Sequence, residues 1–388
     1  MKIKKWSAWP VYGKKEIKIV NKIIRSNQIF SKNEVILFEK DFSKYIGVKY
    51  SKCVGNATQG LHLSLAALGI GVGDEVIVTN FSWISTASCI LMQNAVPVFC
   101  DIESKSLGID PFEIEKKITK KTKAIIYVHM FGFIADVKKI IKISKQYKIP
   151  LIEDASHAHG SSFNKKKAGN FSDLAIFSLH QRKNLPSGEG GIITSNKKNL
   201  INKIHKLRSF GDKELSYNYR MTEFCAGIAR VRLKKINYEN KLRNLYANFI
   251  FKKCENIKGI SFLKPRKNSF TNFHKLILIY NDKFLIKNIK FFITYMNKRN
   301  IPFEKVYAPL NKHNHFNPTK NIKRGISWKW KLYTNKKIPL KMKKLNFPVT
   351  EEYSLKKLTQ LDIHPTLPKI LLINLTKEIK NYVIKYSK

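Results

Sequence analysis

Short apolar runs alternate with helical stretches between about residue 50 and residue 195. The apolar runs are rich in Val and Ile, have the length of strands, and read YSKCV, DEVIVTN, VPVFCDI, KAIIYVHMF, IPLIEDA, LAIFSLH and GGIITS. Between them, LHLSLAAL, TASCILMQ and the segment from Asp136 to Tyr147 have the pattern of helices. Strands that alternate with helices predict an α/β fold with a mostly parallel central sheet that is covered on both faces.

The pattern changes after Asn199. LINKIHKLRSF and the segment from Thr222 to Phe251 carry apolar residues at intervals of three and four, which predicts long helices. Beyond about residue 252, the runs GISFL and HKLILIY and a helical stretch from Lys287 to Arg299 indicate a smaller α+β unit. The segment from Asn311 to Asn335 is rich in Lys, Asn, His and Trp and predicts a loop or lid.

The chain of 388 residues is well above the ~150 residues of one ordinary domain. We therefore expect a large domain over residues 1–250 and a small C-terminal domain over residues 251–388. The start has no apolar run of signal-peptide length, and no later segment approaches the ~18 apolar residues of a membrane span. These features predict a cytoplasmic protein without membrane contact.

The charge balance is strongly basic, because 73 Lys and Arg residues against 27 Asp and Glu residues give a net charge of +46. Such a charge can indicate nucleic-acid binding. Here Lys spread along the whole chain carries the excess, so we interpret it mainly as a bias in residue usage. A basic nucleic-acid-binding or regulatory protein stays an alternative. The basic runs 165–167 and 197–198 predict exposed turns.

The cysteine and histidine spacings do not indicate a metal site. The five cysteines never form a C-x-x-C pair, which argues against both a disulfide framework and a zinc site. His157 and His159 lack a third clustered ligand, so no metal is expected. The run GIGVG at 69–73 lacks the spacing of a dinucleotide fingerprint and leads from a helix into a strand, so it predicts a simple connection.

The residues that end the predicted strands carry the chemistry, because ligands of open α/β sheets bind at the carboxyl ends of the strands. IPLIED ends in Asp154, and LAIFS ends in Ser178, five residues before Lys183. A lysine that is partly desolvated there has a lowered pKa and is nucleophilic. Ala57 and Thr58, between the first strand and its helix, direct backbone N–H groups at an anion. A carboxylate, a lysine and an anion site are what pyridoxal phosphate (PLP) requires.

Several motifs together resemble the DegT/DnrJ/EryC1/StrS family of sugar aminotransferases. They are WPVYGKKEI, GNATQGLHLSLAALGIGVGDEVIV, AVPVFCDI, EDASHAHGSSF, IFSLHQRKNLPSGEGG and YNYRMTEFCAGIARVRL, with a thinner continuation in YAPLNKHNHF. The resemblance implies PLP as the cofactor and the aspartate-aminotransferase-like fold, which is fold type I of PLP enzymes. It also implies a homodimer whose two active sites lie at the interface.

The resemblance assigns a role to each site residue. Lys183 would bind PLP as a Schiff base and shuttle the proton, and Asp154 would pair with the ring nitrogen. His157 stands where the family commonly has Gln, and Ala57 replaces the usual Gly, which costs backbone freedom. The residues implied to bind the cofactor are Ala57, Thr58, Trp83, Asp154, His157, Ser178, Lys183 and, from the neighbouring subunit, Asn218.

The implied reaction moves an amine from glutamate or glutamine to a keto-sugar, which we expect to be nucleotide-linked. A keto-cyclitol is the alternative substrate. Lys183 argues against the dehydratase branch of the family, in which histidine replaces the lysine. No cysteine follows Cys254, which disfavours the branch with an iron–sulfur cluster. Candidates for the substrate-binding wall are Arg220, His315, Trp328 and Trp330.

Overall fold

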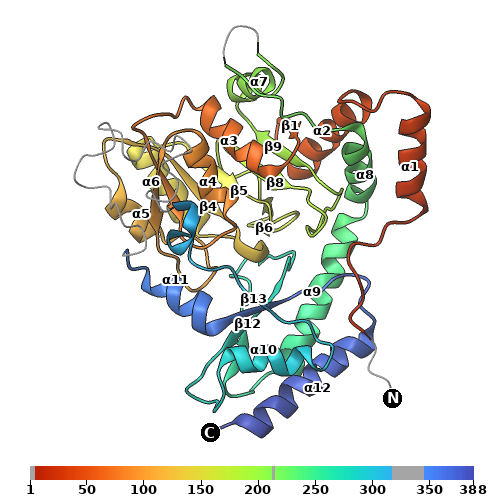
Figure 1. The fold of residues 1–388 in the computed structure, drawn as a ribbon, viewed down its shortest axis with the longest axis vertical. Coiled ribbons are helices and arrows are strands. Elements are labelled where there is room, and N and C mark those ends of the chain that lie inside the picture. Colours follow the sequence, from red (N-terminus) through yellow and green to blue (C-terminus); the bar gives the residue numbers. More distant parts are fainter. Residues whose placement is uncertain (1–4, 212–214, 317–344) are drawn as a thin grey trace.

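The computed structural model describes residues 5–211, 215–316 and 345–388, and its centre is a seven-stranded sheet with the order β1-β9-β8-β5-β4-β2-β3 (Figure 1). The pairs β2–β3, β2–β4, β4–β5 and β5–β8 are parallel, whereas β8–β9 and β1–β9 are antiparallel. The predicted mostly parallel α/β sheet is therefore confirmed. Its strands are β1 (Tyr50–Val54), β2 (Glu75–Thr79), β3 (Val96–Cys100), β4 (Thr122–Val128), β5 (Leu151–Asp154), β8 (Leu174–Ser178) and β9 (Gly191–Ser195).

Helices cover both faces of this sheet. The evidence is that successive residues of one strand pack into two different apolar clusters. Ile125 packs into the cluster that includes residues of α2, α5, α6 and α8, whereas Ile126 packs into the cluster that includes residues of α3, α4 and α7. This alternation places one layer of helices on each face. The bounds are α1 (Lys14–Arg25), α2 (Asn33–Ile46), α3 (Ala57–Ala67), α4 (Ser85–Met92), α5 (Pro111–Lys117), α6 (Val137–Tyr147), α7 (Lys198–Leu207) and α8 (Glu223–Leu233).

A second, antiparallel sheet of order β10-β12-β14-β13 follows α9 (Ile236–Lys253), which leads down to it in Figure 1. Its strands are β10 (Ile260–Phe262), β12 (Leu276–Tyr280), β13 (Glu304–Lys305) and β14 (Leu358–Leu361). The helices α10 (Ile289–Asn297) and α12 (Lys369–Tyr386) pack with it into one apolar cluster, and α11 (Pro348–Glu352) precedes β14. We propose that the boundary between the large domain and the small C-terminal domain lies near residue 250. Among the described residues, no helix is long and apolar enough to cross a membrane.

One of the predicted turns forms a strand instead. Lys166–Lys167 is strand β7, which pairs with β6 (Ser162–Phe163), and β6 also pairs with β11 (Ser269–Phe270). Only Asn164 and Lys165 have the positive φ of a tight turn. The turn is therefore shorter than predicted, because the residues on either side of it pair with each other as a hairpin.

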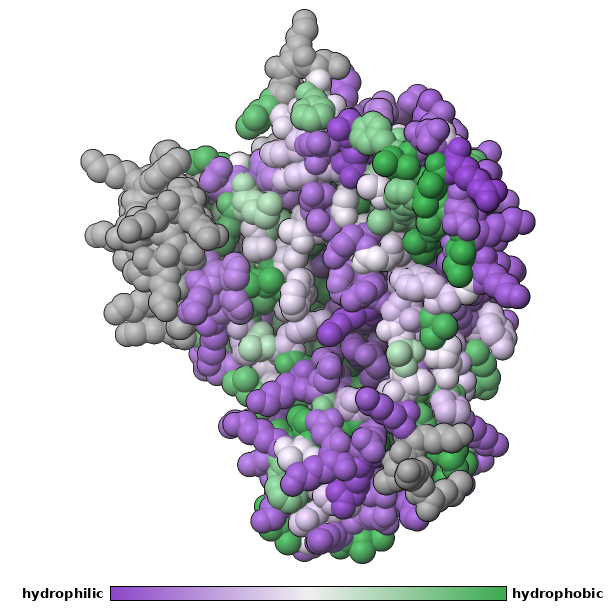
Figure 2. All heavy atoms as spheres, turned by 45° about the vertical axis from the view of Figure 1, so that its right-hand side comes forward, coloured by the Kyte–Doolittle hydropathy of each residue, from purple (hydrophilic) through white to green (hydrophobic). Residues whose placement is uncertain are grey.

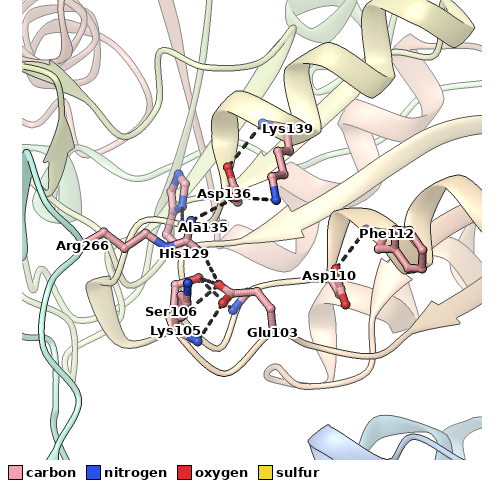
Figure 3. A network of polar contacts seen from close by, with 11 residues as sticks. Glu103, Lys105, Ser106, Asp110, Phe112, His129, Ala135, Asp136, Lys139 and Arg266 are labelled. Atoms are coloured by element: carbon pink, nitrogen blue, oxygen red, sulfur yellow. Dashed lines mark hydrogen bonds and ion pairs between the residues drawn. The ribbon is translucent and has the colours of Figure 1, made fainter.

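Polar contacts also fasten the C-terminal part to the large sheet. Arg266, in the connection between β10 and β11, forms an ion pair with Glu103, and its Nη1 lies 3.2 Å from Oδ2 of Asp136 (Figure 3). Glu103 follows β3, and Asp136 caps the N-terminus of α6. These ion pairs link the connection between β10 and β11 to two segments of the large sheet's side.

Candidate active site

A cleft of about 830 Å³ lies where β4, β5 and β8 end. Val128, Asp154 and Ser178, the last residues of these strands, all line it. This position agrees with the rule that open α/β sheets bind ligands at the carboxyl ends of their strands. The cleft brings together these residues that the sequence predicts: Ala57, Thr58, Trp83, Asp154, His157, Ser178 and Lys183.

Asp154 is nearly buried, and two hydrogen bonds orient its carboxylate. The hydroxyl of Thr86 donates to Oδ2 at 2.8 Å, and the backbone N–H of Ser156 donates to Oδ1 at 3.1 Å. Thr86 is itself held by the hydroxyl of Ser82 at 2.8 Å. The helix α4 therefore fixes the carboxylate in the cleft. Thr86 is a partner of Asp154 that the sequence does not predict.

Lys183 lies in a turned segment between β8 and β9. Its backbone N–H donates to the carbonyl of His180 at 2.8 Å, and its own carbonyl accepts from the indole N–H of Trp9 at 3.3 Å. Burial lowers the pKa of Lys183 to about 8, Asp154 acts in the opposite direction, and Lys275 lowers the pKa further. At pH 7 roughly a tenth of such lysines are neutral, far more than at the ordinary pKa of about 10.4. The nucleophilic character predicted for Lys183 therefore has a physical cause here.

The N-terminus of α3 opens into the cleft beside Ser178. Asn56 caps the helix, since its side chain accepts from the N–H of Gln59 at 2.9 Å. The N–H groups of the first turn have no acceptor within the helix and suit an anion. Ala57 begins the helix and is not among the residues with positive φ. The expected cost of replacing Gly by Ala is therefore absent at this position.

His157 is buried in a stack of rings. Its centroid lies 4.4 Å from that of His274 and 5.9 Å from that of Phe131. Burial, with Lys183 as the next cause, lowers the pKa of His157 well below its usual value, so the ring is neutral at pH 7. Its Nδ1 accepts from the N–H of Phe131 at 3.3 Å, which leaves the proton on Nε2. His157 therefore retains a hydrogen-bond donor.

Aromatic and polar side chains form the remaining walls of the cleft. Trp83 is 57% exposed and packs edge-on against Tyr307, with 5.8 Å between ring centroids. An exposed indole at a cleft offers a face for a planar ring. The cleft is also lined by residues that the sequence does not predict for the site: Thr86, His274, Lys275, Glu304, Lys305, Tyr307 and Gln360. Most of them come from the second sheet and its connections.

Three predicted residues do not line this cleft. Asn218 is exposed and accepts from Nε of Arg220 at 3.0 Å, and the guanidinium of Arg220 lies 4.4 Å from the ring centroid of Phe30. His315 contacts His313. The predicted residues Trp328 and Trp330 lie outside the described residues. Among the described residues, no cluster of three or more potential metal ligands occurs.

Known proteins resemble this chain in sequence. The model of the DegT/DnrJ/EryC1/StrS aminotransferase family matches residues 10–340. GDP-perosamine synthase of Vibrio cholerae is 37% identical over 231 residues, which is 57% of this chain and 63% of that enzyme. L-glutamine:2-deoxy-scyllo-inosose aminotransferase of Streptomyces fradiae is 32% identical over 250 residues, which is 60% of this chain and 58% of that enzyme.

Solved structures agree in fold. The aminotransferase from Psychrobacter cryohalolentis matches with a TM-score of 0.88 at 25% identity, covering 98% of this chain and 99% of that one. The architecture is that of the fold type I aminotransferases, as the sequence predicts.

Proposed function

Because this chain belongs to the DegT/DnrJ/EryC1/StrS aminotransferase family, we propose that it moves an amine from glutamate or glutamine to a nucleotide-linked keto-sugar. One observation carries the proposal: a single cleft contains Lys183, Asp154 and the N-terminus of α3. The printed activity of the Vibrio cholerae relative, a GDP-perosamine synthase, supports a nucleotide-linked sugar. Family membership favours an enzyme over the alternative of a nucleic-acid-binding protein.

The residues of the cleft fit PLP, the cofactor that this family and fold use in general. The first-turn N–H groups of α3 and the hydroxyl of Ser178 suit its phosphate, and Asp154 suits its ring nitrogen. A Cβ atom on Gly191 would lie 2.6 Å from the carbonyl carbon of Asn56, so only glycine lets β9 approach the start of α3 this closely. When bound, PLP withdraws electrons from the substrate carbon and so makes its proton easier to remove.

The chain itself provides attachment, orientation and proton transfer. Nζ of Lys183 is proposed to attach the cofactor until the amine of the donor displaces it. Freed in this way, Nζ would move the proton from the α-carbon of the donor to the cofactor carbon, and in the second half-reaction from the cofactor carbon to the acceptor carbon that gains the amine. The fixed carboxylate of Asp154 would hold the ring nitrogen. His157, neutral with its proton on Nε2, would donate to the ring hydroxyl or lie against the ring face, and Trp83 would cover the other face.

Gly191→Ala is expected to weaken PLP binding about tenfold or more, because the new methyl group displaces N–H groups that would hold the phosphate. Titration of the cofactor-free protein with PLP, followed by absorbance, measures the effect. Gly71→Ala is the matched control, since a Cβ atom there would have no neighbour within 4 Å. Equal affinities in the two variants would contradict the assignment of the phosphate site.

A homodimer with shared sites forms part of the proposal. Helices α1 and α2 and the connection between them expose a group of large apolar side chains. Figure 2 shows apolar side chains gathered on this side of the molecule. They are Ile17, Ile24, Ile29, Phe30, Ile36 and Leu37. Large exposed apolar patches are typical of interfaces. Asn218 is exposed and lies outside the cleft of its own chain, so it is available to the phosphate site of a partner.

Mixing two inactive proteins, Lys183→Ala and Asn218→Ala, is expected to restore about a quarter of the wild-type activity. Random exchange makes half of the dimers hybrids, and each hybrid contains one intact site of two. The measurement is transamination after subunit exchange, with hybrid formation verified by tags of different mass. Verified hybrids without activity would show that Asn218 does not serve the partner's site.

A panel of acceptors tests the substrate itself. Nucleotide-linked keto-sugars and the keto-cyclitol 2-deoxy-scyllo-inosose would be assayed with L-glutamate and L-glutamine as donors. The cyclitol is included because the Streptomyces fradiae relative is named for it. A nucleotide diphosphate is attracted to a basic protein at low salt, so its KM should rise with salt concentration. Amination of the cyclitol alone, insensitive to salt, would replace the nucleotide-linked substrate by the alternative.

A further inference from the structure

A buried lysine next to the second sheet faces the same cleft as Lys183. Lys275 precedes β12, its side chain is 8% exposed, and its Nζ lies 2.6 Å from Oδ1 of Asp362. The strand register explains this pair. Leu276 is opposite Leu361 in the antiparallel pair β12–β14, so the next positions outward are Lys275 and Asp362. The lysine is thereby held at the wall of the cleft by a carboxylate whose side chain is 47% exposed.

Stability alone is a weak reason for this arrangement. A buried ammonium loses its hydration, and an ion pair in such a place is often no more stabilising than apolar residues of similar volume. The ammonium of Lys275 has three N–H donors, and within the described part of the chain its one recorded ion-pair partner is Asp362. Lys275 therefore presents both positive charge and hydrogen-bond donors at the cleft.

The position suits one particular anion. Lys183 takes the proton from the α-carbon of the amino-acid donor, and the α-carboxylate is bonded directly to that carbon. The keto carbon of a sugar carries no such group. Lys275 is close enough to Lys183 that its charge lowers the pKa of Lys183. The diphosphate of a nucleotide-linked sugar is likewise not bonded to the carbon that carries the keto group.

We propose that Lys275, oriented by Asp362, binds the α-carboxylate of the amino-acid donor. The inference rests on the proposed function and adds the site that selects amino acids over simple amines. It applies equally to glutamate and glutamine, because both carry the same group. Lys275 touches the substrate in this proposal, whereas Asp362 is a positioning residue.

The test is the donor half-reaction of the PLP-loaded enzyme, measured as the change of cofactor absorbance when L-glutamate or L-glutamine is added without an acceptor. Lys275→Met should raise the apparent dissociation constant of the reactive donor about ten- to hundredfold, the range of a charge-assisted hydrogen bond. Lys305→Met removes an exposed lysine of the same cleft and should change this constant less than about threefold. The reverse half-reaction with GDP-perosamine should be equally unaffected by Lys275→Met.

Asp362→Asn tests whether Lys275 binds the donor or whether the Lys275–Asp362 ion pair has only a structural role. The substitution removes the negative charge that competes for the cation but keeps an oxygen that can accept from Nζ of Lys275, so the orientation is retained and the donor should bind at least as tightly as in the wild type. Lys275→Gln replaces Lys275→Met if the latter does not fold. Equal losses in the Lys275 and Asp362 variants, a loss confined to the GDP-perosamine half-reaction, or a fall in maximum rate at unchanged donor affinity would each overturn the inference. A wild-type enzyme that reacts with neither amino acid would contradict the proposed function, and the inference with it.

Discussion

Lys183→Ala is expected to lower transamination by about four orders of magnitude or more and to remove the visible absorbance of covalently attached cofactor. A positioned acid–base group alone contributes up to about 10⁴-fold to a rate, and Lys183 would also provide the attachment. The fold should be unaffected, because the substitution removes an amine whose charged form is disfavoured by burial. Absorbance spectra, turnover and thermal unfolding measure the three effects. Lys203→Ala, an exposed lysine of α7 outside the cleft, provides the control.

The pH dependence of Lys183 gives a second measurement that needs no turnover. In the cofactor-free protein, an amine-reactive reagent labels only the neutral lysine, so the labelling rate rises as pH passes through the pKa. Burial lowers that pKa to about 8, whereas exposed lysines titrate near 10.4. Lys183 should therefore be labelled first between pH 7 and 9, as located by peptide mass. Retained transamination in Lys183→Ala, or ordinary labelling at position 183, would contradict its proposed role.

The large sheet, and the part of the cleft at the ends of its strands, could be predicted because short segments of sequence indicate them. Each parallel strand is a short Val- and Ile-rich run, and its last residue faces the ligand-binding edge. The two neighbouring carboxylates Glu153 and Asp154 show the limit of this reasoning. Glu153 is fully buried, where it accepts from the N–H of Phe171 at 3.1 Å and contacts His129 at 2.9 Å, whereas Asp154 enters the cleft. Only the structure, or the family motif, distinguishes the two.

The second wall of the cleft could not be predicted, because it depends on pairings between distant segments. Gln360 of β14 is opposite Glu304 of β13 and Ile277 of β12. No periodicity in any one of these strands indicates its partners, and β13 is only two residues long. The same holds for Lys275, whose partner Asp362 is defined by strand register. The C-terminal helix α12 likewise has no counterpart among the predicted elements.

Asp154→Asn is expected to slow the donor half-reaction by about 10²- to 10⁴-fold while PLP still binds. Asparagine keeps the shape of the side chain but cannot provide the negative charge that favours a protonated ring nitrogen, so the cofactor withdraws electrons less strongly. Thr86→Val is a graded companion, because it removes one hydrogen bond to Asp154 and leaves the one from Ser156. We expect it to slow the same step about tenfold, as measured by stopped-flow absorbance.

Asp154→Asn should also change the pKa of Lys183 in the cofactor-free protein. This measurement tests the charge of Asp154 separately from the contact of Asp154 with the cofactor ring. The carboxylate of Asp154 raises the pKa of Lys183 and so partly offsets burial. Removing this negative charge should lower the pKa below about 8, and the labelling of Lys183 should then begin at a lower pH than in the wild type. Thr86→Val keeps the charge and should leave the labelling profile unchanged. A near-wild-type half-reaction in Asp154→Asn, together with an unshifted labelling profile, would show that another residue holds the ring nitrogen.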